Sequence, residues 1–372
     1  MADPLPAAPP DAARIARLAA RLRSAADPRG LVRLDRFLEI ALYTPDDGYY
    51  TQPRARLGRQ GDFYTAPHLG GLFGRTLARR VQIEVERLGS PDDTLVVDLG
   101  SGDGALAADL VAALREYPDG AALPGRYVVV DRPGPLRDAA LRRARTAADG
   151  SPITVRAAGS VAELGPFTGT VIANELLDAL PVRAVRWEDG RWLEMGVEVT
   201  TDRPRFAPMG PVERMPGPAL PSDVPEGTVL EMPIHAEALV REIGDHLTAG
   251  AVVIVDYGDD EANLVGARSG GTLTAARNHT SLPDPLDAPG SADLSTFVNF
   301  SRVRGAAARA GFRESAYEPM AQALGRWGLP EVLARAVRRA KDAEGEVRLR
   351  LEAKSLAFGF ETFRVLELAP PA

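Results

Sequence analysis

The most informative residues of the sequence are three glycines in the stretch VVDLGSGDGAL (96–106). There an apolar run leads into a turn and then into an alanine- and leucine-rich segment. Gly100, Gly102 and Gly104 would let the backbone turn tightly and come close to a ligand, with the amide groups of a helix start nearby. Two cofactors suit such a turn, a dinucleotide and S-adenosylmethionine (SAM), and a connection without a ligand is the third alternative.

Two aspartates at the ends of strand-like runs favour SAM. Asp98 ends the run TLVVD (94–98), where a carboxylate can help to anchor the methionine ammonium of SAM. Asp131 ends the run YVVVD (127–131), where a carboxylate can accept both ribose hydroxyls. Gly104 and Asp131 are also further apart than the ~20 residues typical of a dinucleotide fold. We therefore expect the SAM site to include Asp98, Gly100, Gly102, Gly104 and Asp131.

Composition excludes several other chemistries. The chain has no cysteine, so thiol nucleophiles, Cys-ligated zinc, iron–sulfur clusters and disulfides are impossible. Its 372 residues, 26% charged and 45% hydrophobic, suit one large α/β domain with insertions or two domains. The formal charge of −7 argues against nucleic acid as a partner, and no apolar run approaches the ~18 residues that span a bilayer. The histidines lack metal-binding spacings, so we expect no metal.

Alternating strand-like and helical stretches predict the fold class. The strand-like runs lie at 94–98, 127–131, 153–156, 170–174 and 251–258. Helical stretches lie between them at 105–116, 135–148 and 235–248. This order predicts an α/β fold with a doubly wound, Rossmann-like parallel sheet. Two C-terminal pieces, GFRESAY (311–317) and ETFRVLEL (361–368), would close it as an antiparallel pair.

Residues 182–232 interrupt this alternation. The segment VRAVRWEDGRWLEMGVEV predicts antiparallel strands joined by a type I′ turn at Asp189 and Gly190. Trp187 and Trp192 flank that turn at positions suited to cross-strand pairing. We expect a β-rich insertion here.

The N-terminal sequence predicts a helix over residues 13–26 after a tail rich in proline and alanine. Leu18 and Leu22 share its apolar face, and Arg14 is expected to lie off that face. An arginine-rich amphipathic start also suits a mitochondrial transit peptide. Acidic residues in the tail favour an ordinary first helix, and we expect a cytoplasmic protein.

Three further stretches carry more polar residues and glycines than packing requires. GRQGDFYTAP (58–67) precedes a helix predicted to begin near Gly70, and residues 271–300 form a long polar segment. ANELLDALPVR (173–183) places Asn174 and Glu175 directly after a strand. They would lie at the carboxyl edge, where open α/β sheets bind ligands.

Together these stretches resemble the MidA-like family, the protein arginine methyltransferases that include the mitochondrial complex I assembly factor and its bacterial relatives. The resemblance spans about residues 35–368. It rests on LYTPDDGYY (42–50), GRQGDFYTAPHLGGLFG (58–74), DLGSGDG (98–104), ANELLDALPVR (173–183), VIVDYG (253–258) and GTLTAARNHT with PGSADLSTFVNF (271–280, 289–300). It implies a class I SAM-methyltransferase core with an N-terminal helical cap. Eukaryotic members methylate an arginine on a complex I subunit.

The resemblance also assigns roles to residues. It places Gly61, Asp62 and Thr65 over the cofactor, and Asn174 and Glu175 facing the methyl group. The sequence departs from the family pattern at His68, where Glu is usual, at Asn299, where Asp is usual, and after Asp131, where RPG follows. The first two departures remove acidic groups, which counts against arginine as the acceptor more than against SAM.

The acceptor decides which side chains would be catalytic. An arginine needs carboxylates that orient the guanidinium and take up its proton, and Glu175 and Asp178 are the candidates. Asp178 could instead cap the next turn. A hydroxyl or carboxylate acceptor would suit a histidine base, and His279 in the long polar segment is the leading choice.

We expect three parts in the chain. Residues 1–92 would form the tail and helical cap with a loop over the cofactor, and residues 182–232 the β-rich insertion. Residues 93–181 and 233–372 would form the methyltransferase core, with a long substrate loop over 259–300.

The leading hypothesis is a SAM-dependent methyltransferase that modifies a protein side chain, arginine in the first place, by in-line transfer. The alternatives are methylation of a small metabolite, a non-catalytic assembly factor that retains SAM binding, and an NAD-dependent reductase. The expected partner is a protein or small-molecule methyl acceptor, with no nucleic acid and no membrane. A homodimer stays open.

Overall fold

The computed structural model describes residues 12–52, 66–89, 91–116, 123–200, 203–212, 219–277, 280–287 and 289–371. The chain forms two compact units. The sheet unit consists of the described parts of Tyr64–Leu176, Arg241–Tyr257 and Ala307–Ala372. The hairpin unit consists of the described parts of Met1–Phe63, Leu177–Val240 and Gly258–Ala306.

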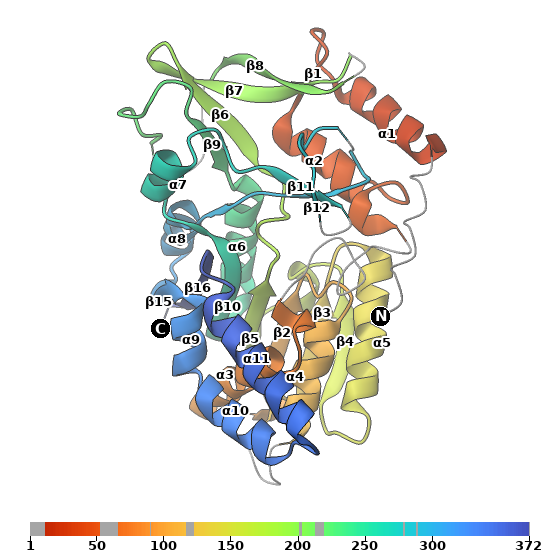
Figure 1. Cartoon of the computed structure of the whole chain (residues 1–372), viewed down its shortest axis with the longest axis vertical. Helices are drawn as coiled ribbons and strands as arrows, with labels where there is room; N and C mark the ends of the chain where they lie inside the picture. The colour runs from red at the N-terminus through yellow and green to blue at the C-terminus, as the bar shows by residue number, and fades with distance from the viewer. Residues whose placement is uncertain are drawn as a thin grey trace. The chain divides into compact units, whose positions relative to one another are not determined.

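Seven of the eight described strands in the main sheet lie in the order β15-β16-β10-β5-β2-β3-β4 (Figure 1), and the eighth, β14 (Val298–Asn299), pairs with Gly258 and Asp259 at the end of β10. In that order, the seven strands are Arg313–Pro319, Phe363–Ala369, Leu247–Asp259, Phe167–Asn174, Thr94–Leu99, Arg126–Val130 and Thr154–Ala158. The five strands from β10 to β4 are parallel, and β16 pairs antiparallel with both β10 and β15. The predicted doubly wound sheet and its closing antiparallel pair are confirmed.

The centre of this sheet follows from its sequence. All six residues of β2 are buried, as expected for a parallel strand that is covered on both faces. Chain order reverses at β2, because β3 lies on one side of it and β5 on the other. In open α/β sheets, ligands bind beyond the carboxyl ends of the strands at such a switch point.

Helices complete the sheet unit. They are α3 (Leu72–Leu88), α4 (Ala105–Arg115), α5 (Gly134–Ala148), α9 (Met320–Arg326), α10 (Leu329–Arg338) and α11 (Ala343–Phe358). Single 3-10 turns are η2 (Ala66–His68), η3 (Pro91–Asp93) and η4 (Ala162–Leu164). The predicted helices at 105–116 and 135–148 are confirmed. The last three helices lie in sequence between β15 and β16, so the closing pair is joined by a helical insertion.

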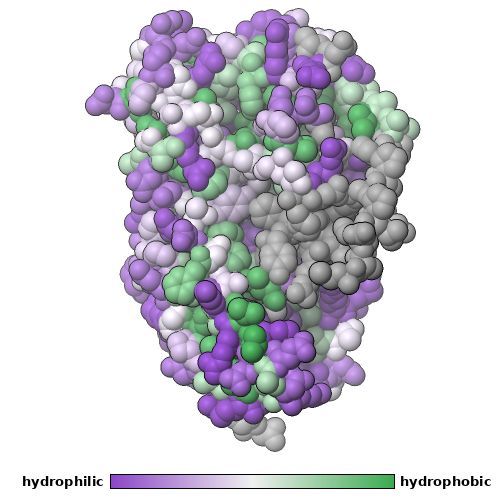
Figure 2. All heavy atoms as spheres, in the orientation of Figure 1, coloured by the Kyte–Doolittle hydropathy of each residue, from purple (hydrophilic) through white to green (hydrophobic). Residues whose placement is uncertain are grey.

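Helix α11 exposes an apolar stripe. Val347, Leu351 and Phe358 are 54%, 57% and 70% exposed, and their spacing puts them on one face of the helix. Figure 2 shows hydrophobic atoms among hydrophilic ones where Figure 1 draws this helix.

A buried charge network ties the C-terminal strand to two helices of the sheet unit. The Glu367 carboxylate on β16, 3% exposed, accepts from Arg80 Nε on α3 at 2.9 Å and from Arg326 Nη2 on α9 at 2.5 Å. Trp327 Nε1 donates to it at 2.9 Å. Burial alone would raise the pKa of Glu367, but the charge of Arg80 and the hydrogen bonds outweigh burial and lower it.

The hairpin unit contains the β-rich insertion. Strand β7 (Arg191–Glu198) pairs with β6 (Arg183–Glu188), β8 (Arg205–Pro211) and the N-terminal β1 (Leu31–Arg33), and β9 (Val229–Met232) pairs with β6. This confirms the predicted insertion.

The turn between β6 and β7 also agrees with the sequence prediction. Asp189 and Gly190 have φ values of +50° and +74°, as a type I′ turn requires. The rings of Trp187 and Trp192 meet edge to face, with centroids 5.4 Å apart. The two tryptophans therefore stabilise the hairpin.

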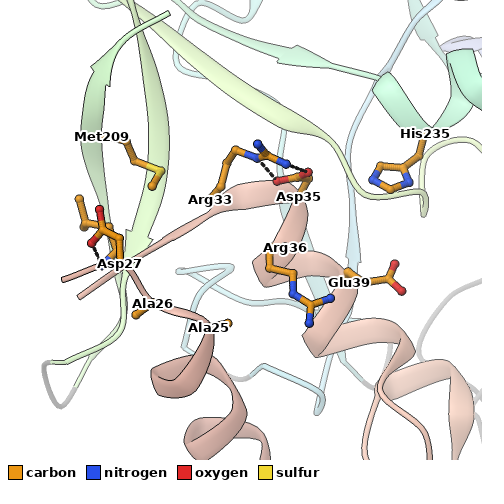
Figure 3. A pocket seen from close by; sticks show the side chains of 10 residues that line it. Ala25, Ala26, Asp27, Arg33, Asp35, Arg36, Glu39, Met209 and His235 are labelled. Carbon is orange, nitrogen blue, oxygen red and sulfur yellow. Dashed lines mark hydrogen bonds and ion pairs between the residues drawn. The ribbon is translucent and has the colours of Figure 1, made fainter. Parts of the chain in front are cut away.

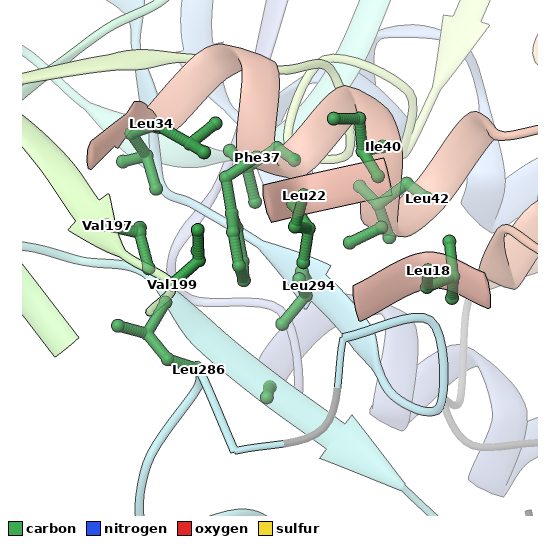
Figure 4. Packing of buried hydrophobic residues seen from close by; sticks show 14 of the residues in the cluster. Leu18, Leu22, Leu34, Phe37, Ile40, Leu42, Val197, Val199, Leu286 and Leu294 are labelled. Carbon is green, nitrogen blue, oxygen red and sulfur yellow. The ribbon is translucent and has the colours of Figure 1, made fainter. Parts of the chain in front are cut away.

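The core of the hairpin unit joins N-terminal helices to this sheet. Helices α1 (Ala12–Ala25) and α2 (Leu34–Tyr43) bury Leu18, Leu22 and Phe37 against the sheet residue Val197 (Figure 4). The 3-10 turn η1 (Tyr49–Thr51) follows α2. The expectation for Arg14 is wrong, because its side chain is buried and donates to the backbone oxygens of Asp47 and Gly290. Two carbonyl acceptors satisfy the guanidinium inside the core.

The remainder of the hairpin unit is more regular than the sequence suggests. Helix α7 (Glu261–Ala267), strands β11 (Thr274–Arg277), β12 (Thr280–Ser281) and β13 (Asp293–Ser295), and β14 (Val298–Asn299) occupy much of the predicted substrate loop 259–300. Strands of two to four residues, flanked by glycines and prolines, are too short to show an alternation of apolar and polar residues. Helices α6 (Ile234–His246) and α8 (Phe300–Arg309) begin in this unit. The predicted three-part division of the chain stays a prediction.

No helix in the described part of the chain has both the length and the apolar composition needed to cross a bilayer.

We predict that Glu367→Gln lowers the free energy of unfolding by about 2 kcal/mol, because the buried Arg80 and the partly exposed Arg326 lose an anion that they share. The pKa of Glu367 is lowered in the folded state, so its contribution is present above the ordinary carboxyl pKa and is lost as the carboxylate protonates in acid. Urea unfolding at neutral and acidic pH measures both effects.

Glu344→Gln is the control, because its carboxylate is 81% exposed and pairs with Arg348 on the surface. It should change the free energy of unfolding by no more than ~0.5 kcal/mol. Equal effects of the two variants would contradict a structural role for the network.

Candidate functional site

The glycine-rich turn lies between β2 and α4 in the sheet unit. Gly100, Gly102 and Gly104 have φ values of +66°, +54° and +82°, which other residues rarely adopt. A Cβ atom at Gly100 would lie 2.6 Å from Leu176 Cδ1, and one at Gly104 would lie 2.5 Å from Ala140 Cα. The turn is therefore both left-handed and too close to its neighbours for other side chains, as the sequence predicted.

Asp98 is the first acid beside this turn. Its side chain is buried, and Tyr127 Oη donates to Asp98 Oδ2 at 2.8 Å. Burial raises the pKa of Asp98 to about 6, although hydrogen bonds from Tyr127 and Ser101 oppose the rise. Tyr127 was missed in the sequence, where the signal was a single phenol in a buried aliphatic run that must find a partner.

Asp131 is the second acid, at the end of β3. The Gly102 amide donates to Asp131 Oδ2 at 3.2 Å, so the turn itself orients this carboxylate. Burial raises the pKa of Asp131 to about 7, and the nearby charge of Asp98 adds to the rise. A carboxylate with so little solvation gains from hydroxyl donors, which suits the predicted ribose contact.

Asn174 and Glu175 stand at the end of β5, one strand from the turn. Glu175 has a φ of +49°, a strained value for a residue with a long side chain. Its amide donates to Val255 O at 2.8 Å, and its Oε1 accepts from Ala66 N at 3.2 Å and Asn174 Nδ2 at 3.3 Å. The backbone and two neutral donors therefore hold this carboxylate in place.

The same region contains a polar atom that requires a ligand or water. Asn174 Oδ1 is buried and has no hydrogen-bond partner within the described parts of the chain. An unsatisfied buried acceptor is costly, and a bound molecule with a donor would satisfy it. Together with the glycine cradle and Asp131, Asn174 fits a polar cofactor at this edge of the sheet.

His68 joins the segment before α3 to the glycine-rich turn. Its Nε2 lies 3.3 Å from Asp103 Oδ2, which Arg143 Nη1 also contacts at 2.7 Å. Burial alone would raise the pKa of Asp103, but the His68 hydrogen bond, the Ala105 amide and the two charges lower it to about 2.

Asn299 has a local partner as well. In the hairpin unit, Asn299 Oδ1 accepts from Arg302 N at 3.3 Å, so it caps the start of α8. Its Nδ2 donates to Glu261 Oε2 at 3.0 Å. An aspartate could cap the helix too, but it would repel Glu261.

The remaining predicted site residues lie elsewhere. Asp178 belongs to the hairpin unit, where its side chain is buried and its backbone oxygen accepts from Thr296 N at 3.0 Å. Four predicted residues, Gly61, Asp62, Thr65 and His279, lie outside the described residues. The roles predicted for all of these residues stay predictions.

The hairpin unit has a surface pocket of about 440 Å³ (Figure 3). Its lining, as far as the structure describes it, is Ala25, Ala26, Asp27, Leu31, Arg33, Asp35, Arg36, Glu39, Met209 and His235. Arg33 pairs with Asp35, and Asp27 pairs with Arg29, so much of its charge is neutralised. The residues predicted from the sequence lie at other positions, and we assign no chemistry to this pocket.

The described residues contain no group of three or more His, Asp and Glu side chains placed to hold a metal ion.

Comparisons with known proteins agree with this geometry. Residues 76–317 match the Methyltransf_28 family, described as "Putative S-adenosyl-L-methionine-dependent methyltransferase". The chain is 29% identical over 310 residues to "Protein arginine methyltransferase NDUFAF7 homolog, mitochondrial" of Drosophila melanogaster, covering 77% of this chain and 69% of that protein.

Two crystal structures of proteins from Burkholderia thailandensis resemble nearly the whole chain. One, bound to S-adenosyl-homocysteine, is 32% identical with a TM-score of 0.84, and the match covers 98% of this chain and 95% of that one. The other, a native structure, is also 32% identical, with a TM-score of 0.82 and the same coverage.

We predict that Gly102→Val abolishes binding of S-adenosyl-homocysteine, because a β-branched residue cannot hold the φ of +54°. Isothermal titration calorimetry measures the loss. The matched control is Gly89→Val, at a φ of +65° with no atom near its Cβ. The control should lose a similar amount of stability and keep its affinity. Equal affinity in both variants would exclude the turn as the site.

We predict that this affinity depends on the charge of Asp131. With a pKa of about 7, Asp131 is charged in about a tenth of molecules at pH 6 and nine tenths at pH 8. Because the charged form accepts hydroxyl donors, the titration of Asp131 should lower affinity about tenfold from pH 8 to pH 6. The titration of Asp98, with its pKa of about 6, should lower it about a further twofold, so the wild type should lose about twentyfold.

Asp131→Asn should lower the affinity at pH 8 and leave about a twofold pH dependence, which comes from Asp98 with its pKa of about 6. Asp149→Asn, on the exposed end of α5, is the control and should keep the full dependence. A flat pH profile in the wild type would contradict the assignment.

Proposed function

The chain belongs to this family of S-adenosyl-L-methionine-dependent methyltransferases, and we propose that it methylates an arginine side chain of a protein. The family, the methyltransferase fold and the SAM cofactor are as the sequence predicted. The acceptor is the new element. The observation that carries it is the Glu175 carboxylate, fixed at the end of β5 beside the glycine-rich turn.

The residues of the sheet unit divide into cofactor contacts and an acceptor contact. When bound, SAM supplies an electrophilic methyl group. Asp131 would accept its ribose hydroxyls, Asp98 would face its ammonium group, and Asn174 Oδ1 would gain a donor. The left-handed glycines would allow close approach of the backbone.

Glu175 suits an arginine acceptor for electrostatic reasons. A guanidinium is cationic at neutral pH and must be oriented and relieved of a proton as its nitrogen is methylated. Ala66 N and Asn174 Nδ2 donate to this carboxylate and orient it at the end of β5. The curated relative from Drosophila melanogaster carries the name of a protein arginine methyltransferase, which supports the same acceptor.

The two departures from the family pattern do not weigh against arginine. Asn299 caps α8 and bonds Glu261, and His68 contacts Asp103. Each residue is matched to a partner in its own surroundings. The absence of acids at positions 68 and 299 therefore does not count against arginine as the acceptor.

A small-metabolite acceptor with His279 as base is the second candidate. Incubation of purified protein with methyl-labelled SAM and cell lysate, separated into protein and small-molecule fractions, distinguishes the two. Label in protein arginines supports the proposal, and label confined to small molecules overturns it. Labelled protein without labelled arginine overturns the arginine assignment alone. A homodimer and a cytoplasmic location stay predictions.

We predict that Glu175→Gln lowers the rate of methyl transfer at least about a hundredfold, the usual contribution of a general base. Its affinity for S-adenosyl-homocysteine should stay within about threefold, because the amide keeps the shape of the side chain.

The matched control is Glu163→Gln, since Glu163 also accepts a backbone amide, from Gly159 at 3.0 Å, elsewhere in the sheet unit. It should retain the wild-type rate. A fully active Glu175→Gln protein would exclude Glu175 from the chemistry, and a non-catalytic SAM-binding protein is indicated if the wild type itself transfers no methyl group.

A further inference from the structure

We propose that His68 is a positioning residue for the methyl-transfer site. Through Asp103, it fixes the turn Ala66–His68 on the glycine-rich turn, and so it holds the Ala66 amide on the Glu175 carboxylate. This inference rests on the proposed role of Glu175 and adds the residue contacts that orient its carboxylate.

The segment Ala66–Leu72 is anchored by three carboxylates from three elements. Ala66 N donates to Glu175 at the end of β5, and His68 contacts Asp103 in the glycine-rich turn. Leu72 N, at the start of α3, donates to Glu352 Oε1 on α11 at 2.6 Å. Carboxylates from three elements therefore contribute to the position of this segment.

Glu352 fixes one end of this segment firmly. The Gly70 backbone lies so near that a Cβ there would be 2.2 Å from Glu352 Oε2. At the Ala66 end, Leu69 N donates to Ala66 O at 3.2 Å, a contact within the segment itself. The His68 side chain, 14% exposed, links this end to the rest of the sheet unit.

Geometry couples His68 to Glu175. Ala66 and His68 belong to one 3-10 turn, so a shift of one backbone moves the other. Asp103 is itself held by the Ala105 amide at 3.0 Å and by Arg143. The Asp103 carboxylate is therefore a fixed point, and His68 transmits that position to Ala66.

This arrangement also favours histidine over an acidic residue at position 68. A glutamate at position 68 would face the Asp103 carboxylate, and the like charges would push the turn away. Histidine provides a nitrogen donor for Asp103 in place of that repulsion.

The test compares four variants with the wild type. His68→Ala should lower the turnover number about tenfold and change the KM for SAM less than threefold, because Glu175 loses its orientation and the cofactor contacts remain. His68→Gln, which keeps a donor, should recover most of the rate. His68→Glu should be as slow as His68→Ala, and Asp103→Asn added to it should restore activity.

Arg115→Ala is the matched control, because Arg115 also joins α4 to α5, through Ala147 O at 2.8 Å, but lies at the opposite end of α4 from the glycine-rich turn. It should stay within twofold of the wild-type rate. Amide hydrogen exchange of the peptide that covers Ala66–Leu72 provides a readout independent of any acceptor. Protection should fall in His68→Ala and return in His68→Gln.

The outcomes separate this inference from the proposed function. If the wild type transfers methyl groups and His68→Ala matches it in turnover and exchange, the positioning role is overturned and the function stands. If the wild type transfers no methyl group, the proposed function fails, and exchange alone decides whether His68 holds the turn. Equal losses in His68→Gln and His68→Ala would also overturn the inference.

Discussion

The left-handed backbone of the glycine-rich turn is the constraint on which the site depends. Gly102 presents its amide to Asp131, Gly104 lets α4 approach Ala140 on α5, and Gly100 leaves room for the side chain of Leu176. Leu176 directly follows Glu175, so the same turn that would hold a cofactor also supports the residue proposed to meet the acceptor. The turn at the end of β2 thus contacts residues that follow β3 and β5.

The sequence predicts the parts of this fold that local patterns determine. Buried parallel strands require continuous apolar runs, and those runs identify the sheet from β4 to β10. The pair Asp189 and Gly190 can take positive φ values together, which identifies the hairpin. Asp98 and Asp131 were predicted because residues at or directly after the end of a buried parallel strand lie at the carboxyl edge of the sheet.

Contacts between distant segments determine what the sequence could not predict. Arg14 is buried because two carbonyl groups, at Asp47 and at Gly290, happen to meet it. The amide of Ala66 donates to Glu175, which lies 109 positions later in the sequence, and no local pattern in either segment predicts this contact. Strands β11 to β14 are too short for alternation to appear, so a region of small strands was predicted as a loop.

The number of acidic residues is a poor guide to an acceptor site, because hydrogen-bond and ion-pair partners decide whether a carboxylate is available to a ligand. Asp103 contacts His68 and Arg143, so its charge stabilises contacts within the protein. Glu175 accepts from an amide N–H and an asparagine Nδ2, which orient the carboxylate at the end of β5. His68 and Asn299, where the sequence departs from the family pattern, therefore make contacts within the protein that stabilise its structure. Glu175, which these neutral donors orient, is therefore the acid that we propose to bind the cationic acceptor.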